Sequence, residues 1–288
     1  MDFKDFKVTN QSFNLSDFKE SYLSDKEDKY FRDKVYDDDV QEMQEWHKKL
    51  NAEGKQGVLV VLQALDAAGK DELIQYIFST LLPQGIKVTS IKQPTKTEQQ
   101  HDYLWRIRDG LPARGELAIL NRSYYENIIA PQIHDSLEDS LLPNVVKKDE
   151  DLIQKRYKHI NGFEEYLFEN GFPVIKLFFH MSKEKQRQRF LERIENPDMQ
   201  HEFSFSDIDD RKKWVEYQDV FQDMLKHTAT EAAPWYILPA DNPWLSRHIV
   251  TQAIIATLKQ MNPEYPTFSQ DEQEKAEKIK RQLENKEL

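Results

Sequence analysis

Cysteine is absent from this sequence of 288 residues. The chain can therefore form no disulfide and no thiolate metal site, and a reducing compartment is permitted. Long hydrophobic runs are also missing, because the longest apolar stretch, residues 58–65, is far too short to cross a bilayer. The amino-terminal sequence MDFKDFKVTN is charged and shows no apolar signal segment. These absences predict a cytoplasmic protein that does not contact a membrane.

An excess of positive charge is missing too. The 40 lysines and arginines are outnumbered by 51 aspartates and glutamates, which gives a formal net charge of −11. This balance argues against general nucleic-acid binding, and it means that an anionic substrate needs a local basic patch. Aromatic residues, in contrast, are plentiful, with 16 Phe, 12 Tyr and 5 Trp. They indicate a substantial core beneath a charged surface, in a chain long enough for one large domain or two small ones.

Apolar runs alternate with helix-like segments from residue 57 onward. The expected strands are residues 57–62, 87–91, 116–120, 173–180 and 235–238. The expected helices between and after them are residues 69–82, 97–109, 122–134, 152–169, 183–194, 207–227 and 243–261. This alternation predicts an α/β fold in which a parallel sheet is connected by right-handed crossovers.

The ends of the chain differ from this pattern. Residues 1–56 form an expected lead segment, irregular to about residue 38 and helical from about 39 to 51. Residues 57–266 form the expected core, and residues 267–288 form a tail that carries both charge signs without an apolar face. Such a tail is expected to be a solvated helix or disordered. The sequence shows no internal repeat and no low-complexity tract.

The stretch LQALDAAGKDELIQYI, residues 62–77, has the form of a phosphate-binding loop between a buried strand and a helix. The Walker pattern G-x-x-x-x-G-K-[ST] is imperfect here, because Ala64 replaces the first glycine and Asp71 replaces the hydroxyl residue. Backbone amides at a helix start lack intrahelical partners and favour an anion. The alternative interpretation is an ordinary turn with a surface lysine.

Individual residues of this loop suggest specific roles. The amides of Ala67, Ala68, Gly69 and Asp71 are expected to bind phosphate, and Lys70 adds a positive charge. A carboxylate at position 66 would repel phosphate unless a cation lay between them. Mg²⁺ binds one or two carboxylates together with phosphate oxygens, so Asp66 is the candidate metal ligand.

The stretch ELAILNRSYYEN, residues 116–127, is the second candidate. Ligands of open α/β sheets bind at the carboxyl ends of strands, so Asn121 and Arg122 are expected in the same crevice as Lys70. Arg122 could bind a phosphate through its planar guanidinium, and Glu126, one helical turn further, could face the site or solvent. Asn121 could instead cap the next helix, and both roles are compatible.

Two further regions contribute positive charge. Residues 87–122 contain an excess of basic residues, among which Lys92 lies at an expected strand end. A basic helix that carries Arg189 and Arg193 is followed by Asn196-Pro197 and another helix. Such an insertion in an α/β kinase suggests a lid, at about residues 195–216, that excludes water from phosphoryl transfer. The alternative is a surface helical hairpin.

Several stretches follow one another from about residue 59 to 241: LVVLQALDAAGKD, LPQGIKVTS, HDYLWRI, LPARGELAILNRSYYE, RYKHINGFE, FFHMSKEKQRQRFLERIENP, DRKKWVEYQ and APWYILPAD. Together they resemble the family-2 polyphosphate kinases, in particular the subgroup that phosphorylates both nucleoside mono- and diphosphates. The resemblance implies a P-loop kinase fold with a five-stranded parallel sheet, flanking helices and a helical lid.

The resemblance also implies an activity. It is reversible phosphoryl transfer from inorganic polyphosphate to AMP or ADP, with GMP or GDP as further acceptors. The implied cofactor is Mg²⁺, with Mn²⁺ as an alternative, and the implied assembly is a homo-oligomer, a dimer or a tetramer. By position, the phosphate and metal motifs match Asp66, Lys70, Asn121, Arg122 and Glu126. The accessory and lid positions match Lys92, Arg106, Arg189, Arg193, Asp207 and Arg211.

The sequence departs from the family pattern at two places. The loop continues Asp71-Glu72-Leu73, where the family usually has a glycine and a hydroxyl residue after the position of Asp71. The lid reads Met199-Gln200-His201-Glu202-Phe203 in place of a stretch rich in Lys, Arg and Trp. Two alternatives therefore remain open: an ATP-dependent P-loop kinase of a small metabolite, and a catalytically impaired homologue that binds polyphosphate or nucleotide.

Overall fold

A mixed sheet forms the centre of the computed structural model, which describes residues 1–134, 136–137 and 140–286. Within these residues the sheet has six strands in the order β1-β6-β5-β2-β4-β3. Their bounds are Lys7–Val8 (β1), Val58–Gln63 (β2), Ile86–Ser90 (β3), Leu117–Asn121 (β4), Val174–His180 (β5) and Trp235–Pro239 (β6). Strands β2 to β6 are parallel, and β1 pairs antiparallel with β6.

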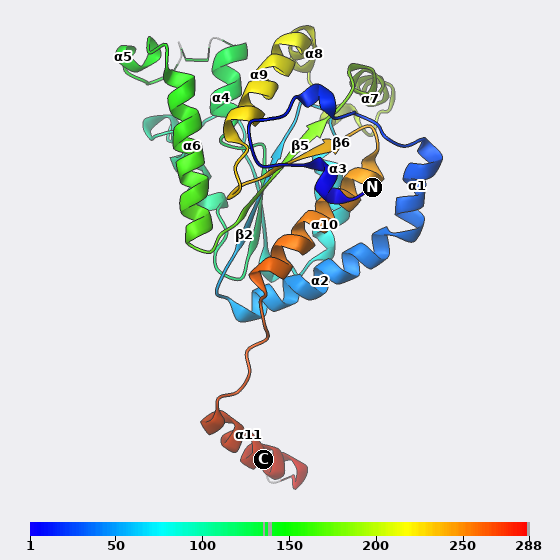
Figure 1. The fold of residues 1–288 in the computed structure, drawn as a ribbon, viewed down its shortest axis with the longest axis vertical. Helices are drawn as coiled ribbons and strands as arrows, with labels where there is room; N and C mark the ends of the chain where they lie inside the picture. Colours follow the sequence, from blue (N-terminus) through cyan, green and yellow to red (C-terminus); the bar gives the residue numbers. More distant parts are fainter. Residues whose placement is uncertain (135, 138–139, 287–288) are drawn as a thin grey trace.

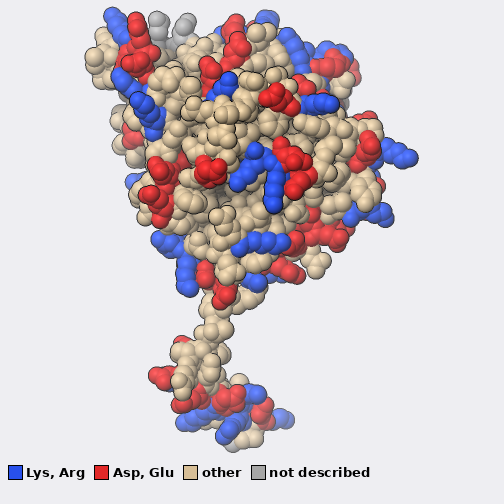
Figure 2. All heavy atoms as spheres, in the orientation of Figure 1, with Lys and Arg blue, Asp and Glu red and all other residues tan. Residues whose placement is uncertain are grey.

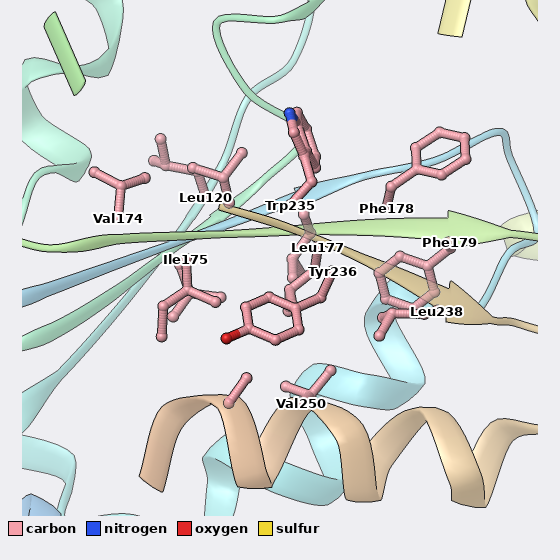
Figure 3. Packing of buried hydrophobic residues seen from close by; sticks show 14 of the residues in the cluster. Leu120, Val174, Ile175, Leu177, Phe178, Phe179, Trp235, Tyr236, Leu238 and Val250 are labelled. Atoms are coloured by element: carbon pink, nitrogen blue, oxygen red, sulfur yellow. The ribbon is translucent and has the colours of Figure 1, made fainter. Parts of the chain in front are cut away.

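The central strands are apolar because both of their faces are covered. Every residue of β2, β5 and β6 is buried, as expected for parallel strands between two helical layers. Figure 3 shows the consequence for β6, where the consecutive residues Trp235 and Tyr236 point to opposite faces of the sheet. Tyr236 points toward the helix that carries Val250.

Two layers of helices enclose the sheet (Figure 1). One layer contains α1 (Asp25–Lys34), α2 (Tyr36–Glu53), α3 (Lys70–Ile77) and α10 (Pro243–Met261). The other contains α4 (Glu126–Ile133), α6 (Leu152–Glu169) and α9 (Trp214–Thr228), and the short α5 spans Asn144–Lys147. The helices α7 (Lys183–Glu195) and α8 (Ser206–Lys212) lie beyond the carboxyl end of β5.

The lead segment is more ordered than the sequence predicts. The expectation of an irregular segment to residue 38 is wrong, because β1 and α1 lie within it. Helix α1 begins at a capping box in which Ser24 and Glu27 bond reciprocally to each other's backbone amides. The expected five parallel strands are all present, and β1 adds a sixth. Its two residues are too few to show a strand period in the sequence.

Two predicted helices are not single α-helices in the structure. The helix predicted for residues 97–109 is absent, and two short 3₁₀ turns, Glu98–Gln100 and Trp105–Gly110, take its place. The Asp102 carboxylate accepts hydrogen bonds from the amides of Leu104 and Trp105, and such local bonds compete with a helix. The helix predicted for 207–227 is two helices, α8 and α9, separated at Lys213.

The helices that flank the candidate loops also differ from prediction. Helix α3 ends at Ile77, before the predicted residue 82, and a 3₁₀ turn Phe78–Thr80 follows. Helix α4 begins at Glu126, four residues after the predicted start. Arg122 has a φ of 60°, which a right-handed helix cannot contain. The sequence pattern does not reveal this left-handed residue, because it is not a glycine.

The charged tail forms a helix, α11 (Gln270–Glu284), which is one of the two predicted outcomes. Figure 1 shows it apart from the body of the protein, at the end of an extended segment. None of its residues is buried. Residues 287 and 288 of the predicted tail lie outside the described residues. Figure 2 shows that the tail and the visible face of the body carry both charge signs intermixed.

Removal of the tail after residue 268 is expected to leave the stability of the body unchanged. Because no residue of α11 is buried, its loss removes no core contact, and the melting temperature should stay within about 2 °C of the full chain's. Thermal unfolding followed by circular dichroism measures this. A larger decrease would show that α11 packs against another surface in solution.

Candidate active site

A cavity of about 550 Å³ opens at the carboxyl ends of β2, β3 and β4. The strand register explains why these ends meet, because Asn121 of β4 pairs with Leu62 of β2 and with Ser90 of β3. The residues that line the cavity are Asp66, Ala67, Ala68, Gly69, Lys70, Asp71, Glu72, Gln75, Ser90, Ile91, Lys92, Gln93, Asn121, Arg122, Arg193, Glu202, Ser204 and Asp207.

The loop between β2 and α3 forms one wall of the cavity. Ala67 and Gly69 have φ angles of 65° and 97°, so the chain turns sharply into the start of α3. A Cβ at Gly69 would lie 2.9 Å from the Glu72 carboxylate and 3.0 Å from the Arg189 guanidinium. The positive φ favours glycine at this position, and a Cβ would also require the ends of the Glu72 and Arg189 side chains to move. The first amides of α3 are left free of intrahelical partners at this wall.

Lys70 folds back over the same loop. Its Nζ donates to the carbonyl oxygens of Leu65 at 3.1 Å and Ala64 at 3.4 Å, and the residue is buried. Burial lowers the pKa of Lys70, whereas the nearby Asp66 carboxylate raises it. The loop thus holds a positive charge against its own backbone, at the position where its amides would meet an anion.

Asp66 and Arg122 form an ion pair across the cavity. A guanidinium nitrogen of Arg122 lies 2.5 Å from an Asp66 carboxylate oxygen, and both side chains are partly exposed. Asp66 raises the pKa of Arg122 against the opposing effect of burial. The left-handed φ of Arg122 is rare for a residue with a side chain, and such conformations are concentrated at functional sites.

Three hydrogen bonds connect the residues beside the cavity. Asn121 donates from Nδ2 to the Asp71 carboxylate at 2.6 Å, which ties the end of β4 to the first turn of α3. Gln63 donates to the Glu126 carboxylate at 2.9 Å, and Ser123 donates to Gln63 at 3.2 Å. Glu126 does not line the cavity, but its charge raises the pKa of Arg122.

Helix α7 and the segment after it form the opposite wall. Arg189 donates to the Ala67 carbonyl at 2.6 Å, and Arg193 lies 3.2 Å from the Glu202 carboxylate. Asp207 at the start of α8 completes this wall. Burial raises the pKa of Asp207, and the Asp66 carboxylate raises it further. Two carboxylates, Asp66 and Asp207, therefore repel one another across the cavity.

The sequence model described as polyphosphate kinase 2 matches residues 24–266.

The chain belongs to the polyphosphate kinase 2 family.

Individual relatives agree with this assignment. The chain is 38% identical over 245 residues to an ADP-polyphosphate phosphotransferase of Rhodopseudomonas palustris, which covers 85% of both chains. It is 41% identical over 217 residues to an AMP/ADP-polyphosphate phosphotransferase of Meiothermus ruber, covering 75% of this chain and 77% of that protein. A crystal structure of polyphosphate kinase 2 from Arthrobacter aurescens superposes with a TM-score of 0.86, at 27% identity and 97% coverage of each chain. The P-loop kinase fold predicted from the sequence is confirmed.

Most of the residues predicted for a polyphosphate kinase 2 site lie together. Of these, Asp66, Ala67, Ala68, Gly69, Lys70, Asp71, Lys92, Asn121, Arg122, Arg193 and Asp207 line the cavity. The other predicted residues, Arg106, Glu126, Arg189 and Arg211, do not.

The three arginines reach the cavity wall from outside, directly or through Gln186, whereas Glu126 accepts a hydrogen bond from Gln63. Arg106 donates to the carbonyl of Lys92, and Arg189 to that of Ala67. Arg211 bonds at 2.9 Å to Gln186, which in turn donates to the Asp66 carbonyl at 3.2 Å. They are placed to support the loops that form the cavity.

Some cavity residues of this polyphosphate kinase 2 protein escaped the sequence prediction. Ser90 and Gln93 lie at the end of β3, where the strand-end rule that identified Lys92 could have found them. Glu202 and Ser204 come from the segment before α8, and no local pattern indicates that they reach the cavity.

No helix among the described residues is long and apolar enough to span a bilayer.

Proposed function

We propose that this protein transfers phosphoryl groups between inorganic polyphosphate and nucleoside mono- or diphosphates. The observation that carries the proposal is the cavity at the strand ends, where the phosphate loop, Lys70 and Arg122 converge in a chain of the polyphosphate kinase 2 family. The relatives named above support these substrates. The cations Lys70, Lys92, Arg122 and Arg193 in the lining supply local positive charge for a polyanion in a chain of net charge −11, and five carboxylates line the same cavity.

The chemistry asks the protein mainly to hold and neutralise phosphates. A terminal phosphate oxygen of the nucleotide attacks the terminal phosphorus of polyphosphate and forms a new P–O bond. The P–O bond to the next phosphate of the donor breaks, and its electron pair leaves with the shortened polyphosphate. The loop amides and Lys70 hold the transferred group, and Arg122 neutralises charge that develops on its oxygens.

The residues of the cavity suit a magnesium ion that arrives with the phosphates. Within the described residues no group of three or more His, Cys, Asp or Glu side chains could hold a metal alone. Mg²⁺ commonly binds one or two carboxylates and completes its shell with phosphate oxygens and water. Asp66 is the proposed ligand, and its charge is close enough to Asp207, across the cavity, to raise the pKa of Asp207. When bound, the ion would neutralise phosphate charge.

A segment after α7 is proposed to act as the lid. Residues 195–216 contain a 3₁₀ turn, Gln200–Glu202, and helix α8. Their side chains Glu202, Ser204 and Asp207 face the cavity. Movement of this segment over bound phosphates would exclude water from the reaction.

A cytoplasmic location and a dimer or tetramer belong to the same proposal, and light scattering after gel filtration tests the assembly.

The donor is tested by incubating the protein with polyphosphate and AMP, ADP or GDP in the absence of ATP. We expect ADP to form from AMP, and ATP and GTP from the two diphosphates, detected by chromatography. A parallel reaction that contains ATP and no polyphosphate is the control. Tight nucleotide binding without any product would instead support a catalytically impaired homologue. In that case the Asp66–Arg122 and Glu202–Arg193 ion pairs would explain the loss, because they occupy cations that phosphate would need.

Metal removal is expected to abolish the transfer. Without a cation, the negative charges of Asp66 and Asp207 would repel the bound phosphates. Dialysis against EDTA should lower the rate by at least about a hundredfold, and added Mg²⁺ should restore it. Mn²⁺ is expected to substitute. An unchanged rate in EDTA would remove Asp66 from the role of metal ligand.

A further inference from the structure

A second cavity adjoins the phosphate loop on the side of α10. Its volume is about 240 Å³, and it shares Ala68, Gly69 and Glu72 with the active-site cavity. Its other walls include Arg189 and Arg247. None of the residues assigned to the transfer itself explains why an arginine from α10 lies there.

Arg247 is buried, and the Glu72 and Asp28 carboxylates raise its pKa without forming an ion pair with it. Only 7% of the residue is exposed. Its guanidinium carbon lies 4.0 Å from the ring centre of Tyr76 and 4.1 Å from that of Trp244, and the two rings contact each other edge to face with their centres 5.4 Å apart. The guanidinium therefore packs into the corner that the two rings form. Within residues 1–134, 136–137 and 140–286, its side chain makes no hydrogen bond and no ion pair. A buried charge normally has such a partner, because its desolvation is costly.

The chemistry of the Arg247 guanidinium indicates which ligand could bind. Arg247 lines the cavity, and its side chain packs against the rings of Tyr76 and Trp244. Its N–H groups match the oxygens of phosphate or carboxylate. An oxyanion is therefore the ligand to which this side chain is suited.

Glu72 connects this cavity with the active site. It lines the active-site cavity, the Arg247 cavity and a third cavity of about 250 Å³ that contains Lys185, Arg189 and Arg193. Its carboxylate lies 3.9 Å from the Arg189 guanidinium, and its charge is close enough to raise the pKa of Arg247 against the effect of burial. A carboxylate of the protein thus stands among cations that lie beyond the phosphate loop.

We propose that Arg247 and Arg189 form a second anion subsite, which binds the distal phosphates of the donor polyphosphate, and that these phosphates displace the Glu72 carboxylate. The proposal rests on the proposed function, because it assumes a donor with more phosphates than the loop can hold. When the terminal phosphate lies at the loop amides, the rest of a linear polyanion must leave the active-site cavity. The cations around Glu72 neutralise the charge of the phosphates along that path, and the Glu72 carboxylate weakens their binding by like-charge repulsion.

The consequence is that the affinity for the donor depends on its length. Arg247 raises the affinity for long chains, and Glu72 lowers it. A tripolyphosphate ends near the loop, whereas a long chain also reaches Arg247. The subsite therefore contributes to the affinity for long chains and little to that for short ones. Glu72 stands at the position where the family pattern has glycine. Its negative charge lowers the affinity for long polyphosphate below that of a relative with a small residue there.

The test compares two donors, tripolyphosphate and polyphosphate of about a hundred phosphates, with ADP as acceptor. In Arg247→Met, which keeps an unbranched side chain against the two rings, the KM for the long donor should rise about tenfold relative to the KM for tripolyphosphate. In Glu72→Gln the same ratio should move about threefold the other way. Arg187→Ala is the matched control, because Arg187 lies on α7, lines none of the three cavities and pairs with Glu184.

Two measurements keep the outcome interpretable. Thermal unfolding establishes that each variant is folded, and Glu72→Gln changes a half-exposed side chain that the fold does not need. Calorimetric binding of the two polyphosphates without nucleotide is independent of turnover. If the wild-type protein binds long polyphosphate more tightly than Arg247→Met but transfers nothing, the proposed function fails and the subsite stands. An unchanged length ratio in both variants, or equal loss for both donors, overturns the subsite.

Discussion

Replacement of Lys70 by alanine is expected to lower kcat/KM for phosphoryl transfer by about 10²–10³-fold. The Lys70 ammonium is buried at the loop, where its two acceptors are the carbonyl oxygens of Ala64 and Leu65. Its charge is therefore already desolvated and oriented before any phosphate binds, and this arrangement is most effective when charge develops during the transfer. Alanine removes that charge and leaves the neighbouring amides in place, so weak phosphate binding should persist.

Controls separate this effect from a loss of structure. Lys259→Ala changes a lysine on α10 that pairs with Glu42, and Lys259 lines none of the three cavities. It should keep wild-type activity. Lys70→Arg keeps the charge but cannot place it at the same point, so an intermediate rate is expected. Circular dichroism should show Lys70→Ala to be folded. An alanine variant with nearly normal turnover would remove Lys70 from the proposed mechanism.

Replacement of Lys176 by methionine is expected to lower the free energy of unfolding by about 3–5 kcal/mol. Lys176 on β5 and Glu164 on α6 are both fully buried, and their charged atoms lie 2.7 Å apart. The lysine also donates to Tyr125 at 3.0 Å and to the Thr228 carbonyl at 2.5 Å. Methionine would leave the Glu164 carboxylate buried without its counter-charge.

The same network reaches the active site through the turn before α4. The hydroxyl groups of Tyr124 and Tyr125 both donate to Glu164, at 2.6 and 2.8 Å, and these tyrosines follow Arg122 closely in sequence. Loss of Lys176 should therefore also reduce turnover at temperatures where the variant remains folded. Urea denaturation measures the stability, and kcat at 15 °C measures the effect on the site.

A second variant distinguishes an unpaired charge from lost packing. The double change Lys176→Met with Glu164→Gln removes both charges, and it should recover a large part of the stability that the single change loses. The exposed pair Lys155–Asp149 provides the comparison, since Lys155→Met should leave the urea midpoint unchanged. A loss of less than about 1 kcal/mol in the Lys176 variant would contradict the expectation.

The parallel sheet and the loop were predictable because both depend on local signals. Strand β2 is a continuous apolar run up to Leu62, and β5 is apolar apart from Lys176 and His180. The register of β2 and β4 brings their carboxyl ends together independently of the helices. The same rule identified Asp66, Lys70, Asn121 and Arg122. The left-handed conformation of Arg122 was not predictable, since it depends on how the turn is held by its surroundings.

Arginine positions were harder to predict than their presence. Arg189 and Arg211 lie on or near the predicted lid, yet they bond to the Ala67 carbonyl and to Gln186. Arg106 belongs to a segment predicted to be a helix, and it contacts the carbonyl of Lys92 after that segment forms turns. A sequence shows how many cations a region carries. Which of them enters a cavity depends on long-range packing that no periodicity records.

The short strand β1 has a consequence for how molecules of this protein behave at high concentration. A parallel sheet with an open edge can pair with the edge of another molecule and start aggregation. Lys7 and Val8 pair with Tyr236 and Trp235, so the amino-terminal residues cover part of the β6 edge. At the other edge, β3 is only five residues long and carries Lys87. The first eight residues thus contribute to keeping the protein dispersed, independently of any role in phosphoryl transfer.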